Sequence, residues 1–128
     1  MAGKSFYSLR IACEEYIYNE ISSLLQVQPK DSDSSNTWWI YEVVEKEDDE
    51  YYDFISNFLD LLEGKYSFLE KLEISRKDIT IWRVYEYDDQ CNMEYDAEEL
   101  KRLGENGINL CISCYQASDD DEDWKVKR

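Results

Sequence analysis

The sequence contains no histidine, one proline and four glycines among 128 residues. Without histidine, the chain lacks the side chain that most often acts as a general acid or base and that commonly completes a zinc site. It has no run of about 20 apolar residues, which a membrane-spanning helix requires, and its first residues show no signal-peptide pattern. These absences predict a cytoplasmic protein whose four cysteines are free thiols.

Basic residues are also scarce, because 14 lysines and arginines stand against 30 aspartates and glutamates, for a net charge of −16. Such a balance argues against nucleic acid and anionic membranes as direct partners, and it favours a basic protein. Apolar residues make up 43% of the chain and aromatic residues 15%. Because a disordered chain has far fewer apolar and aromatic residues, we expect a folded domain with the acids on its surface.

Hydrophobic periodicity predicts alternating strands and helices. Strands are expected at residues 6–13, 37–45, 79–87 and 108–117, and helices at about 14–26, 51–62 and 97–107. Gly64 interrupts the second helix, and the segment YSFLEKLE after it is expected to add another turn or two. The order βαβαβαβ predicts a single α+β domain over residues 1–118, with a mainly antiparallel sheet of four to five strands and helices on one face. Two βα units of similar length suggest a ferredoxin-like arrangement. Residues 119–128 are expected to form a flexible tail, acidic and then basic.

The acidic residues gather in two runs, residues 42–53 and 86–99, with tyrosines between them. Acids in such runs attract a basic protein, and tyrosines are common anchors of protein interfaces. The candidate contacts of the first run are Glu42, Glu45, Glu47, Asp48, Asp49, Glu50, Tyr51, Tyr52 and Asp53. Those of the second are Glu86, Tyr87, Asp88, Asp89, Glu94, Tyr95 and Asp96. The alternative is a general acidic coat that only maintains solubility.

Some of these acids also have a local structural explanation. Asp48, Asp49 and Glu50 precede a predicted helix, whose positive dipole end favours carboxylates. Asp96 stands three residues before Glu99, as in a capping box.

Trp38 and Trp39 are adjacent in a predicted strand, so their side chains point to opposite faces. At most one of them lies in the helix-covered core. The other, together with Trp82 or Tyr41, is predicted to form an aromatic patch on the open face of the sheet, unless both pack under helices or loops.

Catalytic and metal-binding motifs are missing from the sequence. There is no Gly-rich phosphate loop and no nucleophile motif. Carboxylates at adjacent strand ends, such as Glu42, Glu45, Glu86 and Asp88, leave a carboxylate-only enzyme as the third-ranked alternative, because among thirty acids some lie close together by chance. Neither DSDSSN nor DDDED fits an EF-hand loop. We therefore predict no catalytic site, no metal site and no cofactor.

The cysteines do not form a recognisable metal or redox motif. Cys111 and Cys114 have C-x-x-C spacing, but they fall inside a predicted strand, where residues three apart point to opposite faces. Cys13 and Cys91 are isolated in the sequence. We expect all four to be free thiols rather than ligands.

Several motifs carry a resemblance to a known family. They are SLRIAC, the segment EISSLLQVQP with Leu24, Leu25 and Pro29, a Trp-containing strand, and the closing AEELKRLGENGINLCISCY with Leu100, Leu103, Gly107 and Ile108. With these motifs, which cover most of the chain, the protein resembles the small bacterial family known as domain of unknown function 4279. The chain departs from that pattern in having Gln26 where glycine is usual and in its more acidic surface. The resemblance implies a bacterial α+β protein and supplies no catalytic residues.

Together these features predict an acidic, non-catalytic binding protein. Small acidic proteins of this architecture are common among bacterial immunity proteins, an analogy of size and charge. We expect a protein that neutralises a basic toxin, for example a nuclease, by occluding its active or nucleic-acid-binding surface. The alternative is a non-inhibitory ligand-binding or scaffold domain.

Overall fold

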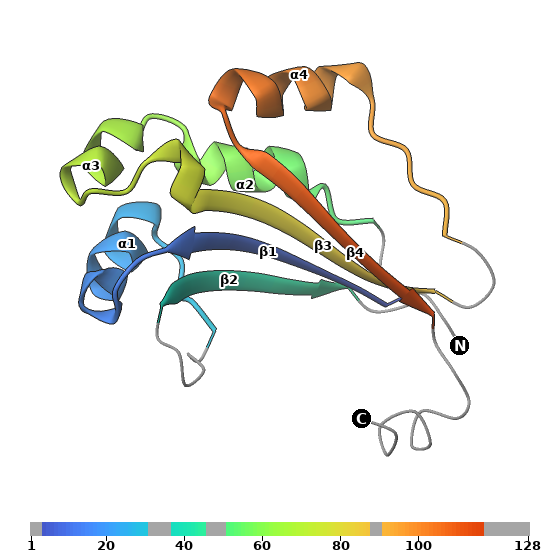
Figure 1. Ribbon diagram of the computed structural model, residues 1–128, viewed down its shortest axis with the longest axis horizontal. Helices are drawn as coiled ribbons and strands as arrows, with labels where there is room; N and C mark the ends of the chain where they lie inside the picture. Colours follow the sequence, from blue (N-terminus) through green and yellow to red (C-terminus); the bar gives the residue numbers. More distant parts are fainter. Residues whose placement is uncertain (1–3, 31–36, 46–50, 88–90, 117–128) are drawn as a thin grey trace, which may run out of the picture.

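The structure, a computed structural model, describes residues 4–30, 37–45, 51–87 and 91–116 of the chain. These residues form a four-stranded sheet with helices on one side (Figure 1). The strands are β1 (Lys4–Ala12), β2 (Trp38–Glu45), β3 (Ile79–Tyr87) and β4 (Asn109–Gln116). Their order in the sheet is β2-β1-β3-β4, with β1 antiparallel to both neighbours and β3 parallel to β4. The predicted α+β class and mainly antiparallel sheet are therefore confirmed.

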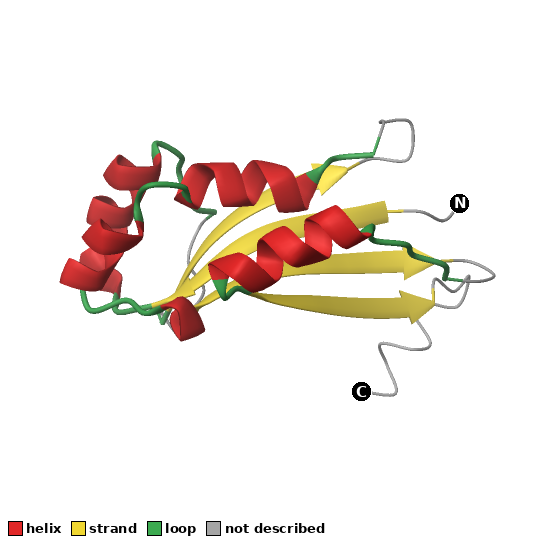
Figure 2. Cartoon of the chain, turned by 90° about the horizontal axis from the view of Figure 1, so that it is seen from above, coloured by secondary structure: helices red, strands yellow, loops and turns green. Residues whose placement is uncertain are grey.

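The helices lie where the sequence predicts them, including the further helix after Gly64. They are η1 (Glu15–Ile17), α1 (Tyr18–Leu25), α2 (Phe54–Leu62), α3 (Tyr66–Lys71), η2 (Arg76–Asp78) and α4 (Ala97–Asn106), where η marks a 3₁₀ turn. Gly64, at a φ of +77° that favours glycine, separates α3 from α2. Figure 2 shows α2 and α4 lying over one face of the sheet, while α1 and α3 gather at the end where β1 finishes. None of the helices in the described ranges has the length and apolarity needed to cross a bilayer.

The strand order differs from the ferredoxin-like arrangement. A ferredoxin-like sheet is built from split β-α-β units, in which another strand lies between the two that a helix connects. Here β3 and β4, which α4 connects, are direct neighbours. Likewise β1 and β2, which α1 connects, pair directly and run antiparallel. The suggestion from two βα units of similar length is therefore wrong at the level of strand order.

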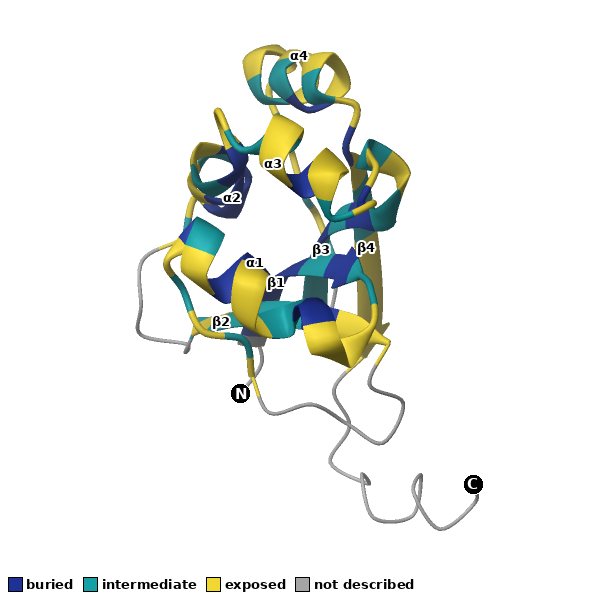
Figure 3. Cartoon of the chain, turned by 90° about the vertical axis from the view of Figure 1, so that its left-hand side faces the viewer, coloured by how far each residue is buried: buried dark blue, intermediate teal, exposed yellow. Residues whose placement is uncertain are grey.

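The core lies between the central strand β1 and the helices. Tyr7, Leu9 and Ile11 of β1 are completely buried, as period-two alternation requires for the face that the helices cover. The helices contribute an apolar stripe to the same core, including Ile21, Leu25, Phe54, Ile55, Phe58, Leu59 and Leu62. Figure 3 shows the buried sides of α1 and α2 in the interior of the fold. Each such side chain contributes about 1.5 to 3 kcal/mol when it is fully buried.

The register separates the two adjacent tryptophans as predicted. Trp39 pairs with Ile11 and is completely buried, whereas Trp38 pairs with Ala12 and is 41% exposed on the opposite, open face. Trp82 lies on the same open face, where the guanidinium carbon of Arg10 is 4.3 Å from the centroid of the Trp82 ring. Trp38 and Trp82 nevertheless do not form one patch, because Trp82 pairs with Ser8, four positions along β1 from Ala12. Tyr41 lies on the helix-covered face instead, edge-on to Phe58.

The outer strands β2 and β4 differ in how well they are covered. In β4, Ile112 on the helix-covered side is 43% exposed and Tyr115 on the open side is 44% exposed. Only Leu103 of α4 is buried. Most of β4 is exposed, whereas most of β2 is buried or half-buried, so β4 is the less covered of the two outer strands.

A buried hydrogen bond between α1 and β2 provides a test of this packing. The indole Nε1 of Trp39 donates to Oγ of Ser22 at 3.1 Å, and both side chains are buried. The Ser22→Ala substitution leaves the indole N–H without its partner, so we expect a loss of about 1 to 2 kcal/mol in the free energy of unfolding, measured by urea denaturation. Ser23→Ala, at an exposed position of the same helix, controls for helix propensity. Equal stability of the two variants would contradict the expected role of this bond.

Candidate functional site

The structure brings the described parts of the two predicted acid runs to the same end of the sheet. Strand β1 begins at this end, and β2, β3 and β4 finish there (Figure 1). The register places Ser5 of β1 between Glu45 of β2 and Tyr85 of β3. Residues 51–53 and 91–96, which come later along the chain than β2 and β3, lie close to one another although they are far apart in the sequence, since Tyr51 and Tyr95 both contact Arg83.

Arg83 lies at the centre of this end, on the helix-covered side of β3. Its guanidinium carbon is 5.6 Å from the ring centroids of both Tyr7 and Tyr51 and 5.1 Å from that of Tyr85. Its Nη1 donates a hydrogen bond to Oη of Tyr95 at 3.0 Å. A cation among aromatic rings is attracted by their quadrupoles. Arg83 therefore links Tyr51 of the first acid run to Tyr95 of the second.

The environment of Arg83 keeps it charged. Burial opposes the charge, but the hydrogen bond to Tyr95 and the neighbouring phenol groups outweigh it, so the pKa of Arg83 lies above its ordinary value. Its Nε is buried and has no hydrogen-bond partner among the described residues. Burial in the same cluster raises the pKa of Tyr51 to about 12, and the Tyr51 phenol is therefore neutral at physiological pH.

Glu45 is occupied by internal hydrogen bonds. Its carboxylate accepts one from Oη of Tyr7 at 2.7 Å and another from the backbone N–H of Tyr52 at 2.6 Å. Burial and the bond to Glu45 raise the pKa of Tyr7 above its ordinary value. Glu45 thus ties the end of β2 to the segment that enters α2, which is a structural use of an acid that the sequence nominates as a partner contact.

Carboxylates also meet at the starts of α2 and α4, where Asp53 and Asp96 occupy the N-cap positions. Oδ1 of Asp96 accepts a hydrogen bond from the backbone N–H of Glu99 at 2.9 Å, as the sequence predicts for this helix start. Partial burial, together with the negative charges of Asp96 and Asp53, raises the pKa of Glu99. The two helix starts therefore bring acids from both runs close enough to interact.

The other predicted contacts are divided between two faces. Glu42 and Glu86 lie on the open face, and Glu42 pairs there with Lys30 at 3.7 Å. Tyr87 stacks against Tyr85 on the helix-covered side, with ring centroids 6.4 Å apart. Glu94 is exposed. The predicted contacts Glu47, Asp48, Asp49, Glu50, Asp88 and Asp89 lie outside the described residues.

We call the exposed and half-buried groups at the starts of α2 and α4 the sheet-end surface. Its members are Tyr51, Asp53, Glu94, Tyr95, Asp96 and Glu99. Tyr51 is 52% exposed despite its contact with Tyr7. Arg83 is not among the contacts predicted from the sequence, whereas Glu99 closes the second predicted acid run and is named there only for its place in the capping box. A signal for Arg83 was present, because strand alternation places it on the same face as Ile79, Ile81 and Tyr85, where an arginine is unusual.

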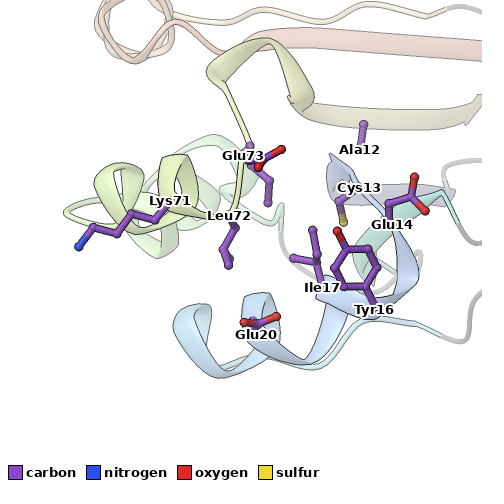
Figure 4. Close-up of a pocket in the computed structure, with 10 residues that line it drawn as sticks. Ala12, Cys13, Glu14, Tyr16, Ile17, Glu20, Lys71, Leu72 and Glu73 are labelled. Atoms are coloured by element: carbon purple, nitrogen blue, oxygen red, sulfur yellow. The ribbon is translucent and has the colours of Figure 1, made fainter.

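A cavity of about 330 Å³ lies at the opposite end of the sheet, between the β1–α1 connection and the end of α3. It is lined by Ala12, Cys13, Glu14, Tyr16, Ile17, Glu20, Lys71, Leu72, Glu73 and Ile74. In Figure 4 the Tyr16 hydroxyl points toward Cys13, and the Lys71 side chain points away from the other lining groups. The volume is at the lower end of the range for small-molecule pockets.

No arrangement suited to a metal ion is found among the described residues, since they contain no group of three or more cysteine, aspartate or glutamate side chains placed to hold one.

Glu45 and Glu42 provide a matched test on one strand. Glu45→Ala removes the acceptor of two hydrogen bonds, and we expect the free energy of unfolding to fall by about 2 to 3 kcal/mol, because bonds to a charged group are the stronger ones. Glu42→Ala removes only a surface ion pair, which is worth about 0 to 1 kcal/mol. Urea denaturation of both variants checks the difference. A Glu45→Ala variant as stable as Glu42→Ala would show that Glu45 is free for other contacts.

Cys13 provides a chemical test of the cavity. Burial raises the pKa of the Cys13 thiol to about 11 from its ordinary value near 9. Because the thiolate is the reactive form, we expect Cys13 in the folded protein to react with iodoacetamide at about pH 8 roughly 100-fold more slowly than in urea-unfolded protein. Peptide mapping by mass spectrometry measures the rate at each cysteine. Equal rates in folded and unfolded protein would contradict the buried environment.

Comparisons with protein families, with curated proteins and with solved structures find no match to this chain. The resemblance to the family described above therefore depends only on the motifs quoted for it.

Proposed function

We propose that the protein is an acidic, non-catalytic binding protein that docks a basic protein on its sheet-end surface. The most specific form of the proposal is a bacterial immunity protein or inhibitor that neutralises a basic toxin such as a nuclease. One observation carries it. Acids and tyrosines from two distant segments converge at one end of the sheet around Tyr7 and Arg83.

The chemistry of the sheet-end surface suits a basic partner. Asp53, Glu94 and Asp96 are exposed, and Tyr51 offers an aromatic ring beside them. Carboxylates steer a basic protein into the encounter and select it, while an exposed tyrosine supplies apolar contact area at low entropic cost. The net charge of −16 adds a long-range attraction toward any positively charged protein.

The framework beneath this surface supports tight binding. Arg83 fixes Tyr95 through a hydrogen bond and lies against Tyr51, so these anchors lose less side-chain freedom when a partner arrives. Inhibition would then be steric, because a protein seated on the basic surface that a nuclease presents to nucleic acid excludes that substrate. The mechanism requires no catalytic group in this chain.

The test begins with the purified protein as bait in a lysate of its native host, over a salt series, with captured proteins identified by mass spectrometry. The captured basic protein is then purified and its affinity measured for two charge-matched variants. One carries Asp53→Asn and Glu94→Lys, in which asparagine keeps a good N-cap. The control carries Glu15→Gln and Glu70→Lys, at the other end of the fold. Each variant has a net charge of −13.

We expect the sheet-end variant to bind its partner at least about tenfold more weakly, which is 1.4 kcal/mol, and the control variant to bind within about threefold of the unmodified protein. Salt should weaken the complex, because exposed charges are screened, and the partner's enzymatic activity should fall when the protein is added. Equal losses in both variants would instead assign the binding to a general acidic coat. If no basic protein is retained at low salt, the proposal fails.

A second candidate function, a ligand-binding module, is favoured by the cavity at the opposite end. Glu14, Glu20 and Glu73 surround apolar side chains there, an arrangement that suits a small organic amine. The probe is a panel of alkyl amines and polyamines, and the readout is slower alkylation of Cys13. Protection by an amine that is lost in Glu73→Gln supports this alternative, and the absence of protection by any amine counts against it.

A further inference from the structure

Two cysteines that are far apart in the sequence meet beside the sheet-end surface. The Sγ atoms of Cys91 and Cys114 are 3.0 Å apart, although the residues are separated by 23 positions. Cys114 pairs with Tyr85 in the sheet register and so points to the helix-covered side of β4. Cys91 lies in the segment that leads from β3 to α4. The sulfur atoms of a disulfide are about 2.05 Å apart, so an approach of about 1 Å would bring these two to bonding distance.

We propose that Cys91 and Cys114 are a reversible dithiol–disulfide pair, which a small-molecule disulfide such as glutathione disulfide oxidises and which thiols reduce. This inference does not depend on the basic partner proposed above. It adds a covalent modification site to the fold, placed where β4 meets the segment before α4.

The other two cysteines are positioned so that they cannot take part. Cys111 pairs with Trp82, and its side chain therefore lies on the open face of the sheet. Cys13 follows the end of β1 and lines the cavity at the opposite end. The pairing is therefore specific, and the C-x-x-C spacing of Cys111 and Cys114, three residues apart in one strand, plays no part in it.

The exchange proceeds in two steps that balance. Cys114 is exposed and Cys91 is half-buried, so the thiolate of Cys114 attacks glutathione disulfide first. A protein–glutathione disulfide forms and one glutathione leaves. The thiolate of Cys91 then attacks the sulfur of Cys114, and the second glutathione leaves. The two protons and two electrons that the protein thiols lose are carried by the two glutathione molecules.

The environment of the pair determines the pH at which it reacts. The hydrogen bond between the two thiols raises the pKa of Cys114, burial adds to this effect, and the positive charge of Arg83 opposes it. Because only the thiolate attacks, oxidation should accelerate as the pH rises. At neutral pH the pair therefore exchanges slowly unless an enzyme assists it.

A disulfide at this position would act on the sheet-end surface. It would close the chain from residue 91 to residue 114 and so enclose α4, which limits the freedom of the unfolded chain. It would also fasten the segment that carries Tyr95 and Asp96 to β4. Oxidation would thereby hold one of the two acid-bearing segments in place against the sheet.

The test treats reduced, full-length protein with glutathione disulfide at about pH 8.5, near the pKa of a free thiol. The reaction is quenched with acid, the protein is unfolded and alkylated, and the mass and the disulfide-linked peptides are determined. We expect the unmodified protein to lose two hydrogen atoms, to keep two of its four thiols and to yield a Cys91–Cys114 linked peptide. A dithiol reductant should restore all four thiols. The Cys111→Ser variant is the matched control and should form the same linkage.

Two further measurements separate a true pair from accidental thiol reactivity. The Cys91→Ser variant lacks the second nucleophile, so the mixed disulfide with glutathione should accumulate on Cys114. The urea midpoint of the oxidised protein should rise above that of the reduced protein, and Cys91→Ser should show no such shift. A persistent mixed disulfide in the unmodified protein, a different linkage, or four free thiols after treatment would each overturn the proposal.

Discussion

The structure depends on the antiparallel pairing of β1 with both of its neighbours. This strand has a ladder on each side, and its register with β2 and β3 decides which side chains share a face. Because side chains alternate with a period of two, a slip of one residue would move Tyr7, Leu9 and Ile11 out of the core. The same pairing makes β2 and β3 finish together, so the segments that follow them meet at one end of the sheet.

That end reconciles two demands that usually conflict. The chain carries many acids, which repel one another, and it also buries tyrosines that must satisfy their hydroxyl groups. Arg83 places a positive charge among the tyrosine rings, and Glu45 accepts a hydrogen bond from the Tyr7 hydroxyl. The acids that remain exposed there, such as Asp53 and Asp96, are the groups that we propose a basic partner contacts.

Much of the fold could be predicted from the sequence, because the signals that specify it are local. Alternation located all four strands, and the Asp96 cap located the start of α4 to the residue. The division of Trp38 and Trp39 between faces followed from the same period. Strand order could not be predicted, since β3 and β4 are separated in the sequence by α4 and their alternation does not show which strands become neighbours.

The candidate site was predictable in composition but not in detail. Two acid runs with tyrosines were visible in the sequence, yet the internal use of Glu45, the central position of Arg83 and the meeting of Cys91 with Cys114 all require knowledge of which strands are neighbours. These contacts join residues from 7 to 38 positions apart, a range at which sequence periodicity carries no information about contact.

The thin cover over β4 gives the acidic surface a further consequence. An edge strand with apolar side chains and unpaired backbone groups is a template on which another copy of the chain can add a strand, and such edges lead to aggregation. Ile112 and Tyr115 leave this edge partly open. Mutual repulsion between copies that each carry −16 opposes that contact at neutral pH. The repulsion weakens as the solution approaches the isoelectric point expected from the composition, near pH 4.2, so in acid net charge no longer keeps the exposed β4 edges of two copies apart.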